Sequence, residues 1–231
     1  DLTEYQLVGM LTILQISMSQ MSTNPHGVTH QSKTKLLDAA LRVIRTRGYA
    51  GTTVDDICHA AGVTKGSFFH HFKGKEDLAI RAADYWGEMT GAFFEGAPYH
   101  VHNDPLDRVL GYIDFRKSIL QGTLPEFTCL VGTMVQETFE TAPAIRDACE
   151  RSISGHAAKL AIDIEEAMKV HNIKADWTAE SLALHTQAVL QGAFILAKAQ
   201  GTAAVAADSV DHLHRYIEML FEQRSPNKPI D

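Results

Sequence analysis

The sequence contains few cysteines, and their spacing excludes the usual cross-linking roles of this residue. The 231-residue chain has three, at Cys58, Cys129 and Cys149, and no two of them form a C-x-x-C arrangement. An odd and widely spaced set fits neither a disulfide framework nor a zinc knuckle. We therefore expect no structural metal and a reducing, cytoplasmic compartment.

Prolines and strand signals are also scarce. No proline occurs between Pro25 and Pro98 or between Pro143 and Pro226. Apolar–polar alternation and the Asn-Gly or Asp-Gly turns of hairpins are missing as well, whereas apolar residues recur at helical spacing almost throughout. This pattern predicts an all-α protein.

The N-terminal stretch lacks the features of a membrane span or a leader. Residues 2–18 are mildly apolar, but they are too short and too polar to cross a bilayer. They also lack the basic start and the small-residue cleavage site of a signal peptide. We interpret residues 1–30 as an N-terminal extension or arm, with a loop at 23–30, and we expect no membrane partner.

Positive charge is in short supply, and only one segment carries a net excess of it. The formal net charge is −7, from 21 Lys and Arg against 28 Asp and Glu. Residues 30–80 carry +3, whereas residues 1–29 carry −2 and the remaining residues carry −8. The global count argues against a nucleic-acid binder, but the asymmetry indicates that the segment 30–80 alone meets a polyanion.

The basic segment has the spacing of a helix-turn-helix. Apolar residues recur at i, i+3, i+4 and i+7 from Leu37 to Ile44, which predicts a first helix. Thr53 and Asp56 form a capping box ahead of a short second helix, and Thr64 is a good N-cap for a third. In a helix-turn-helix the second helix braces the third, so that the third can enter a major groove of DNA.

The predicted third helix, about 65–72, has a small and partly cationic exposed face. Phe68 and Phe72 are expected to anchor the helix from below. Small side chains on the outer face permit close approach to bases or phosphates. Patterning alone leaves a plain helical bundle with well-capped turns as the alternative. The expected outer residues are Lys65, Gly66, Ser67, His70 and His71.

The run from Leu36 to Leu78 resembles the N-terminal DNA-binding domain of the TetR family of transcriptional regulators. Weaker matches at 128–132 and 190–193 are similar to the AcrR-like effector domains of that family. The resemblance implies a three-helix helix-turn-helix domain, followed by a larger helical domain for ligand binding and dimerisation. We expect the first domain at 31–77 and the second at 78–225. The motifs that carry the match are Arg47-Gly48-Tyr49, Thr52-Thr53-Val54, Ala61-Gly62-Val63, and Phe72 with Lys75-Glu76-Asp77-Leu78.

The resemblance also implies which residues touch a palindromic operator in double-stranded DNA. Thr53 and Lys75 would contact phosphates, and His70 and His71 would face the duplex. One position departs from the family pattern, because Phe69 stands where Tyr is usual and lacks the hydroxyl that donates to a phosphate. We therefore expect slightly weaker affinity. Base-edge and backbone contacts would come from Thr64, Lys65, Gly66 and Ser67.

Long helical patterns fill the acidic remainder of the chain. The stretch 182–199 is apolar around most of its circumference and needs cover on several sides. With the helix that follows, it can form half of a four-helix bundle that a second copy completes. The resemblance implies the same homodimer, in which Gly192 allows close approach. The expected helices run from Lys75 to near Gly96 and then over about 105–121, 127–140, 143–171, 178–200 and 206–223.

The resemblance further implies a small-molecule effector pocket in the centre of the second domain and, as the family's usual mode, repression. Glu137 and His156 stand out, because ionisable residues inside an apolar bundle need a partner, and they could pair with each other. For any single aromatic residue or methionine, ordinary core packing is the alternative. The candidate lining residues are Trp86, Met89, Phe93, Phe115, Ile119, Cys129, Thr133, Met134, Glu137, His156 and His185.

Cys129 supports an alternative, a regulator that senses oxidants or electrophiles. A reactive thiol needs a lowered pKa and access, and no Lys or Arg stands within several residues of Cys129, so a buried structural thiol competes with this reading. The sequence has neither a nucleophile elbow nor a Gly-rich phosphate loop, so we expect no enzymatic activity and no cofactor. His100 and His102 with Asp104 lack the further ligands that a metal site requires.

Overall fold

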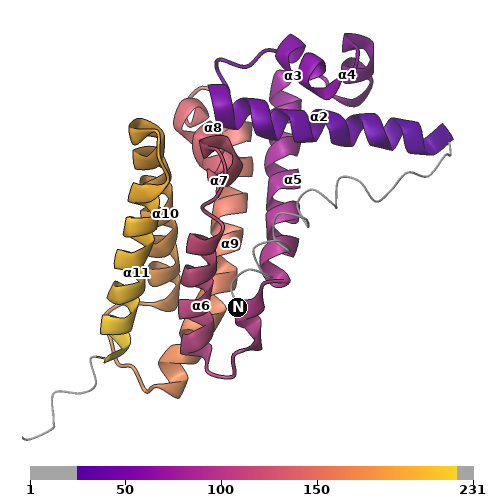
Figure 1. Cartoon of the computed structure of the whole chain (residues 1–231). Coiled ribbons are helices and arrows are strands. Elements are labelled where there is room, and N and C mark those ends of the chain that lie inside the picture. The colour runs from indigo at the N-terminus through magenta and orange to yellow at the C-terminus, as the bar shows by residue number, and fades with distance from the viewer. Residues whose placement is uncertain (1–24, 223–231) are drawn as a thin grey trace, which may run out of the picture.

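The computed structural model describes residues 25–222, and every regular element within that range is helical (Figure 1). The all-α prediction is confirmed. Three helices form the head, in which α2 lies across one end of the molecule and α3 and α4 lie beyond it. The bounds of the head helices are α2 Pro25–Arg47, α3 Val54–Ala61 and α4 Lys65–His71.

The remaining helices form the body, a bundle whose long members run roughly along one direction (Figure 1). Helix α5 leads from the head into the body. Helices α10 and α11 form the edge of the body that lies farthest from α5. No helix in residues 25–222 is long and apolar enough to cross a bilayer. The body comprises α5 Lys75–Glu95, a 3-10 helix Pro98–Val101, α6 Pro105–Ser118, α7 Leu124–Phe127, α8 Leu130–Thr138, α9 Pro143–Val170, α10 Ala179–Gln200 and α11 Ala204–Glu222.

The short helices of the head are fixed by the caps that the sequence predicts. The backbone N–H of Thr53 donates to Asp56 Oδ2 at 2.9 Å, and the N–H of Asp56 donates to Thr53 Oγ1 at 3.1 Å, which completes the capping box of α3. Gly62 ends α3 in the left-handed region, with φ of 64°. Thr64 Oγ1 then accepts the N–H of Ser67 at 3.2 Å and begins α4.

The two parts of the molecule share one helix as a support. Fully buried side chains of the head, among them Leu36, Ile57 and Phe68, pack together with Leu78 and Ala82 from the first turns of α5. A second apolar cluster lies lower in the body, around residues of α6, α9, α10 and α11. Because α5 belongs to the core of the head and also packs along α9, the head is built directly on the body.

Two predicted boundaries are wrong. Helix α2 already begins at Pro25, so residues 25–30 are helical, although we expected a loop at 23–30. The helix expected over 127–140 begins only at Leu130 and ends at Thr138, because Thr128 and Cys129 have extended backbone that separates α8 from the short helix α7. Neither residue is a proline or glycine, so the sequence gives no conspicuous sign of the break. The rest of the proposed N-terminal extension, 1–24, lies outside the described residues.

Candidate nucleic-acid interface and the adjoining pocket

Helix α4 has one buried side and one outer side. Phe68 is fully buried and Phe72 nearly so, as the sequence predicts. Phe69 is 58% exposed and meets the Phe68 ring edge-on, with the centroids 5.2 Å apart. The head therefore presents an unburied aromatic ring beside its polar residues. Of the other predicted DNA contacts, those with exposed side chains or backbone are Thr53, Thr64, Lys65, Gly66 and His70, and Ser67 and His71 are half-buried.

The cation at the start of α4 is paired within the head. Lys65 Nζ lies 2.8 Å from Asp55 Oδ1, and both side chains are well exposed. Hydrogen bonding to Asp55 raises the pKa of Lys65. A phosphate or base that binds Lys65 must therefore compete with a carboxylate on α3. The role of Lys65 in DNA contact remains a prediction, and Asp55 is a neighbour that the sequence reading missed.

Lys75 has a structural task that the sequence did not indicate. Its ammonium donates to the carbonyl oxygens of Tyr49 and Thr52, each at 3.0 Å, and lies 4.2 Å from the centroid of the Tyr49 ring. These bonds tie the start of α5 to the turn between α2 and α3. A phosphate contact by Lys75 remains a prediction, but it would have to share an ammonium that already has two acceptors.

His71 links α4 to α2. Its Nε2 lies 2.7 Å from Ser32 Oγ, and the ring is half-buried. Burial lowers the pKa of His71, with smaller contributions from His70 and Lys33, so the ring is neutral at pH 7. His71 therefore contributes packing and a hydrogen bond to the head, and His70 is the more exposed of the two predicted histidines.

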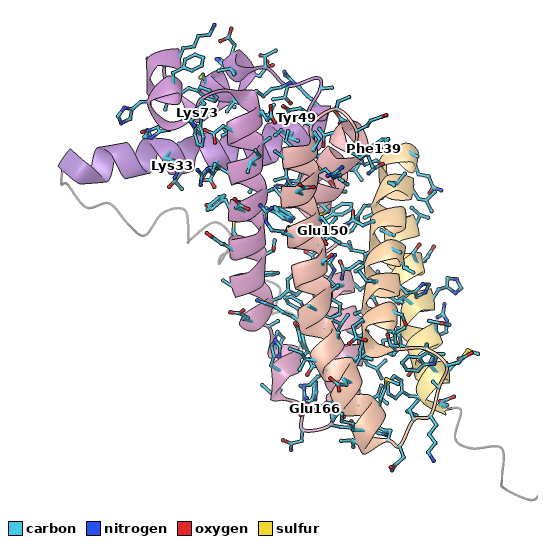
Figure 2. The ribbon with its side chains drawn as sticks, turned by 180° about the vertical axis from the view of Figure 1, so that it is seen from behind. Lys33, Tyr49, Lys73, Phe139, Glu150 and Glu166 are labelled. Atoms are coloured by element: carbon cyan, nitrogen blue, oxygen red, sulfur yellow. The ribbon has the colours of Figure 1, made fainter. Side chains whose placement is uncertain are left out.

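A carboxylate from α8 holds the turn that follows α2. The backbone N–H groups of Tyr49 and Ala50 donate to Glu137 Oε1 and Oε2, at 3.2 and 2.7 Å. Gly48 has φ of +80°, and a Cβ at this position would run into the Glu137 carboxylate. Figure 2 shows Tyr49 at the junction of head and body. Glu137 thus joins the body to the head directly.

Arg45 of α2 makes a second contact between head and body, in which a charged side chain of the head donates to the backbone of the body. Arg45 Nη1 donates to the carbonyl oxygens of Glu126 and Thr128, at 3.2 and 3.5 Å. The guanidinium lies 5.0 Å from the centroid of the Trp86 ring. Burial lowers the pKa of Arg45 to about 10, which leaves it charged at pH 7. Sequence spacing could not reveal these partners, because they stand some eighty residues away.

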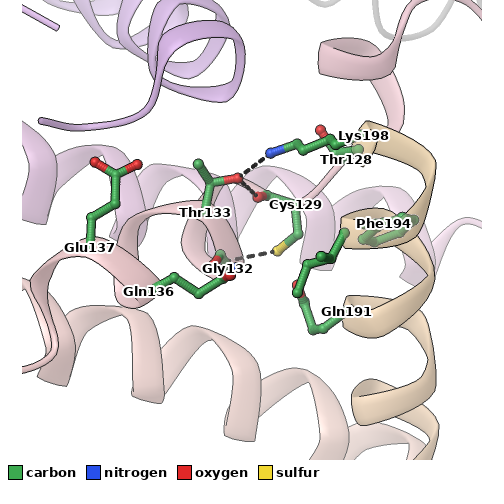
Figure 3. Close-up of a pocket in the computed structure, with 10 residues that line it drawn as sticks. Thr128, Cys129, Gly132, Thr133, Gln136, Glu137, Gln191, Phe194 and Lys198 are labelled. Atoms are coloured by element: carbon green, nitrogen blue, oxygen red, sulfur yellow. Dashed lines mark hydrogen bonds between the residues drawn. The ribbon is translucent and has the colours of Figure 1, made fainter. Parts of the chain in front are cut away.

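Between α8 and α10 lies a pocket of about 220 Å³ (Figure 3). Lys198 Nζ donates to Thr133 Oγ1 at 2.8 Å, and Thr133 Oγ1 donates to the carbonyl oxygen of Cys129 at 2.9 Å. The N–H of Gly132 donates to Cys129 Sγ at 3.4 Å. The lining residues are Thr128, Cys129, Gly132, Thr133, Gln136, Glu137, Gln191, Phe194, Ile195 and Lys198.

Three of the residues predicted to line an effector pocket, Cys129, Thr133 and Glu137, meet here. The others do not line this pocket. Met134 is fully buried, and the Phe93 and Phe115 rings pack with centroids 5.3 Å apart. Trp86 and Met89 pack against the core shared with the head, Ile119 packs against the lower core, and His185 is exposed beside Tyr216.

His156 does not pair with Glu137. Its Nε2 lies 2.9 Å from the hydroxyl of Tyr112, which also accepts a hydrogen bond from Gln187 Nε2 at 3.2 Å. Burial lowers the pKa of His156 to about 3, and the positive charges of Arg116 and Lys159 act in the same direction. The imidazole is therefore neutral, and its partner is a hydroxyl rather than a carboxylate.

The segment before α6 that contains His100, His102 and Asp104 makes structural hydrogen bonds. Asp104 caps α6 by accepting the N–H of Leu106 at 2.8 Å, and it lies 2.8 Å from His171 Nε2. His100 Nε2 lies 3.0 Å from the carbonyl oxygen of Phe94. Across residues 25–222, no three His, Cys, Asp or Glu side chains are grouped so as to hold a metal ion.

Both parts of this chain match families of known proteins. Residues 36–82 match the family described as bacterial regulatory proteins, tetR family. Residues 105–213 match the tetracyclin repressor-like C-terminal domain. The chain belongs to the TetR family. It is thus a DNA-binding transcriptional regulator with an N-terminal helix-turn-helix.

Alignments of this TetR-family chain with individual relatives cover most of its length. It is 26% identical to the uncharacterized HTH-type transcriptional regulator YxaF of Bacillus subtilis, over 71% of this chain and 84% of the relative. It is 25% identical to the HTH-type transcriptional repressor DhaR of a Mycobacterium species, over 83% and 91%. A TetR transcriptional regulator from Chloroflexus aurantiacus has a similar structure, with 26% identity, a TM-score of 0.72 and coverage of 82% and 96%.

The ion pair of Lys65 leads to a prediction for DNA affinity. Replacing Asp55 with Asn releases Lys65 and removes a negative charge beside the duplex, so binding should tighten by up to about fivefold at low salt, since exposed ion pairs contribute roughly 0.2–1 kcal/mol. Lys65→Ala should weaken binding and lower the salt slope by about 1. Fluorescence anisotropy with a duplex selected from a random pool measures both changes.

The matched control for this prediction is Asp84→Asn. It removes the same charge from an exposed ion pair with Arg151 in the body and should leave the affinity unchanged. Equal or weaker DNA binding by Asp55→Asn would show that Lys65 does not contact the duplex.

Proposed function

We propose that this regulator is a repressor that binds a palindromic operator as a homodimer and leaves it when a small molecule enters the pocket between α8 and α10. One observation carries the regulatory part of the proposal. Glu137 lines this pocket and also accepts the two backbone N–H groups that follow α2. A change at the pocket wall therefore acts directly on the DNA-binding head.

An uncovered apolar face supports the homodimer. Helices α10 and α11 form the outer edge of the body, and their exposed side chains include large apolar ones. Several large apolar side chains left exposed on one pair of neighbouring helices are typical of an interface. A two-fold axis here would complete a four-helix bundle and present two α4 helices to one duplex, about 34–36 Å apart if they read successive grooves. The exposed apolar residues are Leu184, Ile195, Leu196, Tyr216 and Met219.

The contacts between pocket and head support effector control. Thr128 and Glu137 belong to the pocket wall, and both are bonded to the end of α2, through Arg45 and through the Tyr49 and Ala50 amides. A ligand that shifts α8 would move these acceptors together. A coupling of about 1–3 kcal/mol changes operator affinity by roughly 5- to 150-fold, which is sufficient for regulation.

The homodimer is tested at its proposed interface. Leu196→Asp places a charge in the apolar face, so the protein should become monomeric and its operator affinity should fall on the order of 10²-fold or more, as the second half-site is lost. Light scattering and anisotropy on a selected palindrome measure the two effects. Ile162→Asp is the control, since Ile162 is equally apolar and 66% exposed on α9. A wild-type monomer, or a Leu196→Asp monomer that binds DNA at full affinity, would contradict the proposal.

Cys129 keeps a second candidate function open, the sensing of oxidants or electrophiles. Its sulfur belongs to the pocket wall at the N-terminus of α8, and Arg45 and Lys198 lie within electrostatic reach. No cation stands near this thiol along the sequence, but the fold brings these two close to it. Cationic surroundings and access are what a reactive thiol needs.

Mass spectrometry after mild peroxide or quinone treatment tests this second candidate. Cys129 should be modified first, whereas the other two thiols are buried and should react slowly. Burial raises the pKa of Cys58, and it raises that of Cys149 to about 12. Cys129→Ser should abolish any loss of DNA binding that the treatment causes. An unmodified Cys129 in the treated wild type ends the redox alternative.

A further inference from the structure

We infer that the pocket between α8 and α10 takes a small carboxylate with an apolar frame, and that Lys198 is its counter-charge. The inference rests on the proposed function, in which this pocket receives the effector, and it adds the chemical class of the ligand. Four features carry it: an ammonium that forms no ion pair, further positive groups nearby, a buried hydroxyl without a partner, and an apolar wall.

The ammonium of Lys198 lacks an acidic partner. It donates to Thr133 Oγ1, a neutral hydroxyl, and no carboxylate within the described part of the chain forms an ion pair with it. The acid that lines the same pocket, Glu137, has both oxygens bonded to head amides. The side chain of Lys198 is exposed at the rim of the pocket, and partial desolvation of its ammonium lowers the pKa of Lys198. An anion would offset that desolvation.

Other positive groups surround the same space. Arg45 lies behind the pocket wall and donates to carbonyl oxygens of Leu41, Glu126 and Thr128. The nine-residue helix α8 also begins at the pocket, and the start of a helix favours negative charge. These groups favour an anion over a neutral or cationic ligand, against the opposing negative charge of Glu137, which also lines the pocket and acts on Lys198.

Thr128 supplies an unused donor. Its side chain is fully buried, and its hydroxyl is the buried side-chain polar atom without a hydrogen-bond partner in residues 25–222. Leaving such a group unsatisfied costs about 1–3 kcal/mol, so native structures seldom keep one without a reason. Thr128 lines the pocket, and its hydroxyl, which is covered in this structure, would turn toward a carboxylate oxygen held by Lys198 and donate a hydrogen bond to it.

The remaining wall sets the size and the frame of the ligand. Phe194 and Ile195 line the pocket from α10 and provide apolar surface. The volume of about 220 Å³ lies below the roughly 300–1,000 Å³ that is typical of sites for drug-sized molecules. A single aromatic ring or a short aliphatic chain bearing one carboxylate suits this space. Benzoate is the simplest probe with these properties, and benzamide is its uncharged counterpart of the same shape.

Calorimetry on the full-length protein, with benzoate and benzamide as probes, tests the inference. Benzoate should bind at least about tenfold more tightly than benzamide, because a charge-assisted hydrogen bond is roughly twice as strong as a neutral one. Lys198→Met should remove this preference and leave benzamide affinity within about twofold of the wild type. Thr128→Val should weaken benzoate binding several-fold. Lys169→Met, at an exposed lysine of α9 that pairs with Glu165, is the control and should change nothing.

Equal affinities for the two probes, no benzoate binding, or a benzoate preference that survives Lys198→Met would each overturn the inference. Thermal unfolding of each variant shows that it is folded before it is titrated. Anisotropy on a selected palindrome, with the same wild-type sample, separates this failure from that of the proposed function. If the duplex is bound but benzoate is not, the carboxylate inference alone fails. If no duplex is bound, the repressor proposal fails whatever benzoate does.

Discussion

Two backbone amides at the end of α2 donate to one carboxylate on α8, and this contact fixes the DNA-binding head on the body. The carboxylate is that of Glu137, and the amides are those of Tyr49 and Ala50. Gly48 has positive φ, which strains any other residue, and a Cβ there would displace the Glu137 carboxylate from this contact. Arg45 makes the reciprocal contact, from a head cation to carbonyl oxygens of the body.

These contacts give the short helix α8 two tasks. It forms one wall of the pocket, and it holds the turn that positions α3 and α4. Helix α5 supplies a second connection, because its first turns belong to the core of the head. Under the proposed effector control, a small shift of α8 would be enough to act on the turn, because the bonds between them already exist.

The head could be predicted from the sequence because its signals are local. The Thr53–Asp56 box, the left-handed Gly62 and the Thr64 cap lie within a dozen residues and determine α3 and α4. Most long helices of the body were also predictable, because uninterrupted helical patterning marks them. The break at Thr128 was not, because that residue has no strong preference against helix.

The candidate site was only partly predictable, because its contacts join distant parts of the chain. Cys129, Thr133 and Glu137 were identified, but Lys198 stands 65 residues from the threonine that it contacts and was missed. The acceptors of Lys75 are carbonyl oxygens of a turn more than twenty residues earlier. The type of a residue does not indicate such a carbonyl acceptor, and the phosphate contact expected for Lys75 came from the family resemblance.

Hydrogen exchange at the Ala50 amide is the most direct measure of whether the body holds the head. Ala50 is exposed, so its N–H has no reason to be protected other than the bond to Glu137. The account predicts slow exchange in the wild type and in Glu140→Gln, a neighbouring exposed acid, and faster exchange in Glu137→Ala. Exchange at the rate of an open loop in the wild type would contradict it.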